Sequence, residues 1–168
     1  MKIEYLEERI NEYKASIQIV IEKRILWNLE KKPLILKVLK DAEESYKIGW
    51  RVQELKWVHI NEAVNITFDT FPPDLIEKTN QIPTYQFIQG GSLIFTQMHN
   101  GDINVFVIFP FVENLAHEED DVVDLGTYPP HSITEKLVVE MIDEFLKEII
   151  KWEVPIIKRK LGFNPQQF

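Results

Sequence analysis

The sequence predicts a single α+β domain in which helices at both ends of the chain flank an antiparallel sheet of about five strands. Three observations predict it. Apolar residues recur at helical spacing in residues 1–48 and 132–168. In the stretch between these two segments apolar residues alternate with polar residues, and an Asn-Gly pair joins the two most strand-like runs. The 168 residues, 45% of them hydrophobic, suffice for one core. We therefore expect one domain over 1–168, with helices in 1–48, a sheet in 50–112, an acidic connector in 113–130 and a helix with a tail in 132–168.

The first predicted helix covers residues 3–27 and carries a narrow apolar stripe. Alternating steps of three and four residues, the spacing of a coiled-coil seam, connect Ile3, Leu6, Ile10, Tyr13, Ile17 and Val20, and then Arg24 and Trp27. Two kinds of partner fit this stripe: the chain's own helices at 35–46 or 133–152, or the same stripe of a second copy in a homodimer. Pro33 predicts an interruption and the start of a second helix, which Gly49 ends.

From Trp50 onward the period of the pattern changes to two. Alternation over 64–68 predicts a strand, paired with 52–60 through a tight turn at Asn61-Glu62. A third short strand is expected over 85–88, ending at a turn formed by Gly90-Gly91. These strands and the hairpin that follows them predict a meander of antiparallel hairpins.

The strongest local signal is Asn100-Gly101 between the strand-like runs 92–99 and 102–112, because this pair is favoured in two-residue hairpin loops. Such a loop places His99 opposite Asp102 and Gln97 opposite Asn104. The four polar side chains would then form one patch at the hairpin tip. A histidine beside an aspartate could act as a general base or bind a small molecule, so this patch is a candidate ligand site. The alternative is an ordinary solvent-exposed hairpin tip.

The last predicted helix runs from 133 to about 152. Ser132 and Glu135 have the spacing of a capping box at its start. Its broad core-facing stripe consists of Leu137, Val138, Met141, Ile142, Phe145, Leu146 and Ile149.

Charge is distributed unevenly along the chain, whose formal net charge is -8. Residues 61–130 hold eleven acidic residues and a single base, Lys78, whereas the two ends are close to neutral. This distribution disfavours nucleic acids and favours cations or a protein partner with a basic surface, if it does more than keep the protein soluble.

The acidic connector is a second candidate site, since carboxylates with one histidine suit Ca²⁺, Mg²⁺ or Mn²⁺. The candidate ligands are Glu113, His117, Asp120 and Asp124. Their spacing differs from that of a calcium-binding loop, and a solvated acidic loop is the alternative.

The chain contains no cysteine, which excludes thiol catalysis, thiolate metal sites and disulfides. Its first residues lack the apolar run of a signal peptide, and its apolar runs are too short for a membrane span. We expect a cytoplasmic protein without a membrane or nucleic-acid partner and without a cofactor other than a divalent cation.

No catalytic motif is present. The expected function is a non-enzymatic interaction or sensory-type module that dimerises through its first helix. The alternative is a ligand- or cation-binding protein or enzyme.

Overall fold

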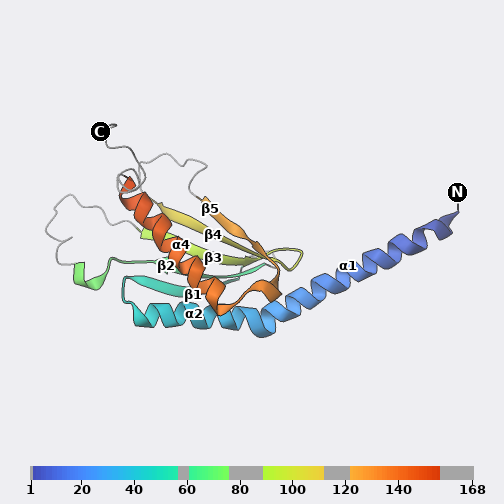
Figure 1. Ribbon diagram of the computed structural model, residues 1–168, viewed down its shortest axis with the longest axis horizontal. Helices are drawn as coiled ribbons and strands as arrows, with labels where there is room; N and C mark the ends of the chain where they lie inside the picture. Colours follow the sequence, from blue (N-terminus) through green and yellow to red (C-terminus); the bar gives the residue numbers. More distant parts are fainter. Residues whose placement is uncertain (1, 57–60, 76–88, 112–121, 156–168) are drawn as a thin grey trace.

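The computed structural model of the protein describes residues 2–56, 61–75, 89–111 and 122–155. It confirms the α+β class: a five-stranded antiparallel sheet has two helices on one face, while a long N-terminal helix extends away from it (Figure 1). The helices are α1 (Glu7–Leu26), α2 (Lys32–Ser45) and α4 (Glu135–Glu153). The strands are β1 (Trp50–Lys56), β2 (Glu62–Phe68), β3 (Gln89–Gln97), β4 (Ile103–Phe111) and β5 (Val122–Tyr128).

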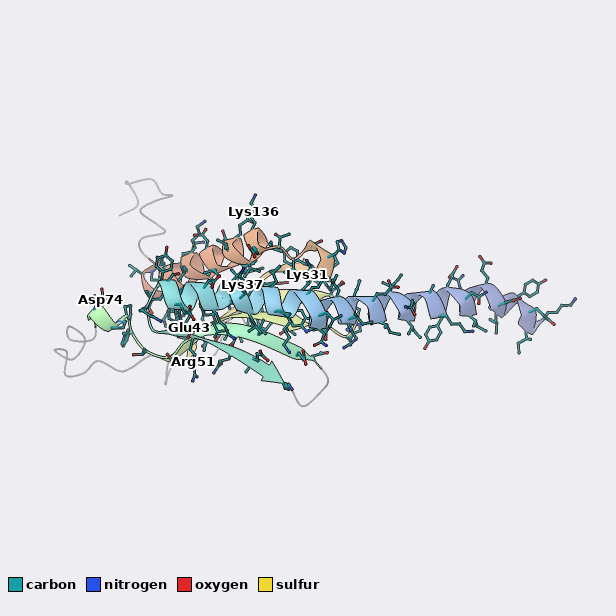
Figure 2. The ribbon with its side chains drawn as sticks, turned by 90° about the horizontal axis from the view of Figure 1, so that it is seen from below. Lys31, Lys37, Glu43, Arg51, Asp74 and Lys136 are labelled. Carbon is teal, nitrogen blue, oxygen red and sulfur yellow. The ribbon has the colours of Figure 1, made fainter. Side chains whose placement is uncertain are left out.

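The N-terminal helices are joined without a break, so the predicted separation near Pro33 is wrong. A π-helical turn, Trp27–Lys31, connects α1 directly to α2. The two helices are in line in the view of Figure 2, and Figure 1 shows a bend between them. In this turn the backbone N–H of Lys32 donates to the carbonyl of Trp27, five residues earlier. The wider turn accommodates Pro33, which has no N–H to donate and whose ring would crowd the carbonyl four residues before it in a regular α-helix.

The strands follow one another in space in the order β1-β2-β3-β4-β5, as expected for a meander. Their positions differ in part from the prediction. Residues Val122–Tyr128, assigned to the connector, form β5 along β4, and the strand expected over 85–88 lies outside the described residues. Glu62 pairs with Lys56 and therefore belongs to β2, not to a turn. Gly90 and Gly91 lie within β3 with positive φ angles of 95° and 89°, so they bend the strand instead of ending it.

The hairpin register predicted from Asn100-Gly101 is wrong by one residue. The N–H of Met98 donates to the carbonyl of Asp102, and the N–H of Gly101 donates back to the carbonyl of Met98. The loop therefore has three residues, with Gly101 at a φ of 88°, and Gln97 pairs with Ile103. Because side chains alternate along a strand, this shift moves every residue of one strand to the opposite face from that expected.

Helix α4 confirms the predicted C-terminal helix, although its cap differs. The hydroxyl of Thr134 accepts a hydrogen bond of 3.1 Å from the N–H of Leu137, whereas Ser132 lies in a preceding 3₁₀ turn, Pro130–Ser132. The predicted stripe of α4 packs on the sheet: Phe145 is fully buried with its ring centroid 5.5 Å from that of Phe68 in β2. Helix α2 packs beside it over β1 and β2, so the core lies between these two helices and one face of the sheet.

Candidate interaction surface

Of the described residues, those with exposed large apolar side chains gather mainly on α1 and the short helical turn before it. Among the described residues no other element lies beside most of the length of α1, and none of its side chains is buried (Figures 1 and 2). Five of the six predicted seam residues are between 41% and 78% exposed, and the sixth is half-buried: they are Ile3, Leu6, Ile10, Tyr13, Ile17 and Val20. We call these six residues the α1 seam. Ile3 and Leu6 lie in the 3₁₀ helix Ile3–Leu6 that leads directly into α1, and the other four lie in α1 itself. No helix within the described chain covers them.

The stripe continues past the α1 seam, but there the protein's own sheet covers it. Trp27, the next apolar residue in the repeat, is only 1% exposed and belongs to the core. At this end of the stripe the Trp27 indole N–H donates to Glu62 of β2, and the 3₁₀ turn Pro130–Ser132 contacts the π-helical turn. The predicted partners at 35–46 and 133–152 do not cover residues 3–17.

The tip of the β3–β4 hairpin fixes this end of α1. Lys23 forms an ion pair with Asp102 at 2.8 Å, and Arg24 donates a hydrogen bond of 2.8 Å to the carbonyl of His99. The backbones approach so closely that a Cβ added to Gly101 would lie 2.6 Å from the Cβ of Lys23 and 3.4 Å from the carbonyl oxygen of Val20. We call this contact the hairpin clamp. It holds α1 in one direction relative to the sheet.

A second group of polar contacts lies one turn further along, below the π-helical turn. Glu62 in β2 accepts hydrogen bonds from the Lys32 ammonium at 3.1 Å and the Trp27 indole N–H at 3.3 Å. Burial by itself would raise the pKa of Glu62. These two hydrogen bonds, together with the positive charges of Lys32 and Lys56, outweigh that effect and lower its pKa below the usual value. The carboxylate is thus stabilised in its charged form and ties the helix to the sheet.

Four basic residues, Lys23, Arg24, Lys31 and Lys32, lie near Trp27, where they would complement the dipole of a helix that ended there. The helix does not end, and these side chains instead reach across to other elements: Lys23 and Arg24 to the hairpin tip, and Lys32 to β2. Lys31 likewise donates to the carbonyl of Ile133 at 2.9 Å. The clustering of these four basic residues within ten positions was visible in the sequence, but the groups that they contact depend on the tertiary structure.

The predicted polar patch at the hairpin tip is divided by the changed register. Gln97 points toward the helices, is 4% exposed and lies 3.4 Å from Arg24. Asn104 lies on the opposite face, where it donates to Asp124 and to the carbonyl of Gly126, each at 3.1 Å. His99 is exposed, while Asp102 is occupied by Lys23. Gln97 and Asp102 contact α1, and Asn104 contacts β5. The four side chains therefore do not share one surface.

Three of the four predicted metal ligands, Glu113, His117 and Asp120, lie outside the described residues. The fourth, Asp124, is exposed in β5 and accepts hydrogen bonds from Asn104 and from the N–H of Gly126 at 2.9 Å. Within residues 2–56, 61–75, 89–111 and 122–155, no three acidic or histidine side chains are grouped as a metal site requires.

One hollow was not anticipated from the sequence. It has a volume of about 290 Å³, lies at the end of the sheet away from α1, and is lined mainly by apolar groups from β2, β3, β4 and α4. Glu153 at its edge has a pKa raised by burial. Its lining comes from both ends of the domain, including Phe68, Gly90, Pro110 and Ile149, so no local sequence pattern could have revealed it.

Comparison of the chain with protein-family models, with curated proteins and with solved structures found no match. Within the part of the chain that the structure describes, no helix combines the length and apolarity needed to cross a bilayer.

Proposed function

We propose that this protein is a non-enzymatic interaction module that self-associates through the α1 seam. The single observation that carries the proposal is the projecting helix: it presents five exposed large apolar residues at coiled-coil spacing and contributes no buried side chain within α1. A helix kept only for folding would bury its apolar side chains. The sheet domain instead has its own core, formed with α2 and α4.

The hairpin clamp supports this proposal. A helix that leaves a domain without fixed contacts would lose orientational freedom when it binds, which weakens association. Here the ion pair between Lys23 and Asp102 and the hydrogen bond from Arg24 hold the helix before any partner arrives. The seam is thus presented in a fixed direction.

A partner with a basic surface remains a further expectation from the charge distribution. Among the described acids of residues 61–130, Glu62, Asp69 and Asp102 already form ion pairs within the chain. Asp124 accepts two hydrogen bonds, as described above. The acidic groups for such a partner would therefore come chiefly from Asp74 and the acids in segments outside the described residues.

The test replaces two seam residues, Ile10→Lys with Ile17→Lys, and measures mass by native mass spectrometry over a wide range of protein concentration. We expect a dimer for the wild type and a monomer for the variant. The melting temperature of the monomeric domain should be preserved, because neither side chain is buried. The matched control is Tyr5→Lys with Ile19→Lys, which removes two exposed apolar residues from another side of the same helix. A monomeric wild type at all concentrations, or equal effects of the two variants, would refute the proposal.

A further inference from the structure

We infer that two copies of the protein pair their α1 seams antiparallel, overlapping over residues 3–20, so that the two sheet domains lie at opposite ends of the helix pair. This inference rests on the proposed function and adds the geometry of the partner. It follows from three features of the molecule: which side of α1 the hairpin occupies, where the charged residues flanking the seam lie, and how long the free seam is.

The first feature is the position of the hairpin clamp. The residues of α1 that touch the hairpin are Val20, Lys23 and Arg24, and Trp27 follows them into the core. Val20, Arg24 and Trp27 continue the repeat of the seam itself, so the hairpin occupies the same side of the helix as the seam, immediately beyond it.

That position obstructs a parallel pair. Parallel helices in a two-stranded coil lie 8–10 Å apart with equal residues at the same level. Each hairpin tip would then occupy, at residues 20–24, the space between the two helices. An antiparallel pair avoids the conflict, because residue 3 of the second copy lies beside Val20 and the second helix ends where the hairpin begins.

The second feature is the charge beside the seam. Seam residues alternate between the a and d positions of a heptad, which assigns Glu7 and Lys14 to e positions and Arg9 and Ser16 to g positions. A parallel pair brings Arg9 against Lys14 of the second copy on both sides, although it also brings Lys2 against Glu7. An antiparallel pair instead brings Glu7 against Lys14 of the second copy twice, both times along the flank where e positions face e positions.

The remaining antiparallel contacts are close to neutral. Arg9 would face Ser16 of the second copy. Lys2 would face Lys23, whose charge is already compensated by Asp102 at 2.8 Å. Arg9 is itself paired with Glu12 of its own helix, which weakens its repulsion of Lys14 in a parallel pair. Only the antiparallel pair places Lys14 beside an opposite charge, that of Glu7 of the second copy, and the flanking charges favour it for this reason.

The third feature is the length of the seam. Residues 3–20 span roughly 27 Å at a rise of 1.5 Å per residue. Antiparallel overlap of this segment with itself pairs an a residue with a d residue in each layer: Ile3 with Val20, Leu6 with Ile17, and Ile10 with Tyr13. Every seam residue therefore has a partner residue in the second copy. The contact is short, so the dimer should dissociate measurably on dilution.

The absence of cysteine from the chain permits a direct test by disulfide formation. We would prepare Leu6→Cys and Ile17→Cys as separate full-length proteins, then oxidise each alone and the two mixed. The antiparallel pair places these two cysteines in one layer, whereas two copies of Cys at position 6 lie about 16 Å apart, beyond the reach of a disulfide. We expect cross-linking in the mixture, with one chain of each kind, and little in either protein alone. Tyr5→Cys mixed with Ile17→Cys is the control and should not cross-link.

Efficient cross-linking of Leu6→Cys with itself would overturn the inference and establish the parallel pair. Failure of the mixture to cross-link, while native mass spectrometry still shows dimers, would also overturn it. A wild-type protein that is monomeric at every concentration would instead refute the proposed self-association, so the two failures are distinguishable.

Discussion

Reversing the charge of Lys14 should weaken the dimer if its helices are antiparallel and strengthen it if they are parallel. In the antiparallel pair Lys14→Glu turns two attractive contacts with Glu7 of the second copy into two repulsive ones. In the parallel pair the same change turns two repulsive contacts with Arg9 into two attractive ones. One substitution thus gives effects of opposite sign.

The expected size follows from the number and exposure of these pairs. Exposed ion pairs on helices contribute about 0.3–0.5 kcal/mol each, and like charges cost a similar amount. Reversal therefore changes each contact by about 0.6–1 kcal/mol, and the two contacts together by about 1–2 kcal/mol. Since each 1.4 kcal/mol is a factor of ten, the dimer Kd should rise by roughly 5- to 30-fold.

Sedimentation equilibrium at low ionic strength measures this change directly, and added salt should reduce it because exposed charges are screened. The double variant Glu7→Lys with Lys14→Glu restores both opposite-charge contacts and the net charge, so its Kd should return toward that of the wild type. Glu8→Lys, on the outward side of α1, is the matched control and should leave the Kd unchanged. A lower Kd for Lys14→Glu would refute the antiparallel arrangement.

Two further predictions concern the contacts that hold α1 to the sheet. Glu62→Gln should reduce the free energy of unfolding by about 1–2 kcal/mol at neutral pH, since Glu62 accepts hydrogen bonds from Lys32 and Trp27. The fold lowers the pKa of Glu62, so its contribution is present above the usual pKa and disappears as the pH falls through the lowered value. Urea titrations at several pH values check this, with the more exposed Glu54→Gln as a nearly neutral control; an undiminished difference in strong acid would contradict it. Gly101→Ala should cost about 1–3 kcal/mol through its positive φ and should also loosen the hairpin clamp. Faster amide hydrogen exchange over residues 20–27 than in Gly126→Ala, a positive-φ control away from α1, would reveal the second effect, and equal exchange would argue against it.

The sequence by itself determined the elements whose side-chain period is long and uninterrupted. The apolar repeats in residues 3–27 and 133–152 continue over several turns, so the helical state of both segments and the core-facing stripe of α4 were predictable before any tertiary contact. The alternation around Ile66 and the Asn-Gly pair likewise predicted a hairpin-rich antiparallel sheet.

Local sequence patterns predicted the wrong structure where the same residues are compatible with two backbone conformations. Asn100-Gly101 is compatible with a two-residue loop and with the three-residue loop that forms, and the choice shifts the register by one. Packing decides it: the observed register places Phe95 and Val105, both fully buried, toward α2 and α4. Pro33 was similarly ambiguous, because a proline can begin a helix or be accommodated within one by a π turn.

The candidate surface shows the same division between sequence and tertiary structure. The spacing of Ile10 and Ile17 predicted a seam, yet it could not show whether these side chains are covered, because burial depends on elements distant in sequence. Only the tertiary structure shows that Trp27 is buried in the core of the domain while residues 3–17 are exposed. The reason is physical: periodicity is a local property of the chain, whereas the contact between Lys23 and Asp102 joins residues 79 positions apart.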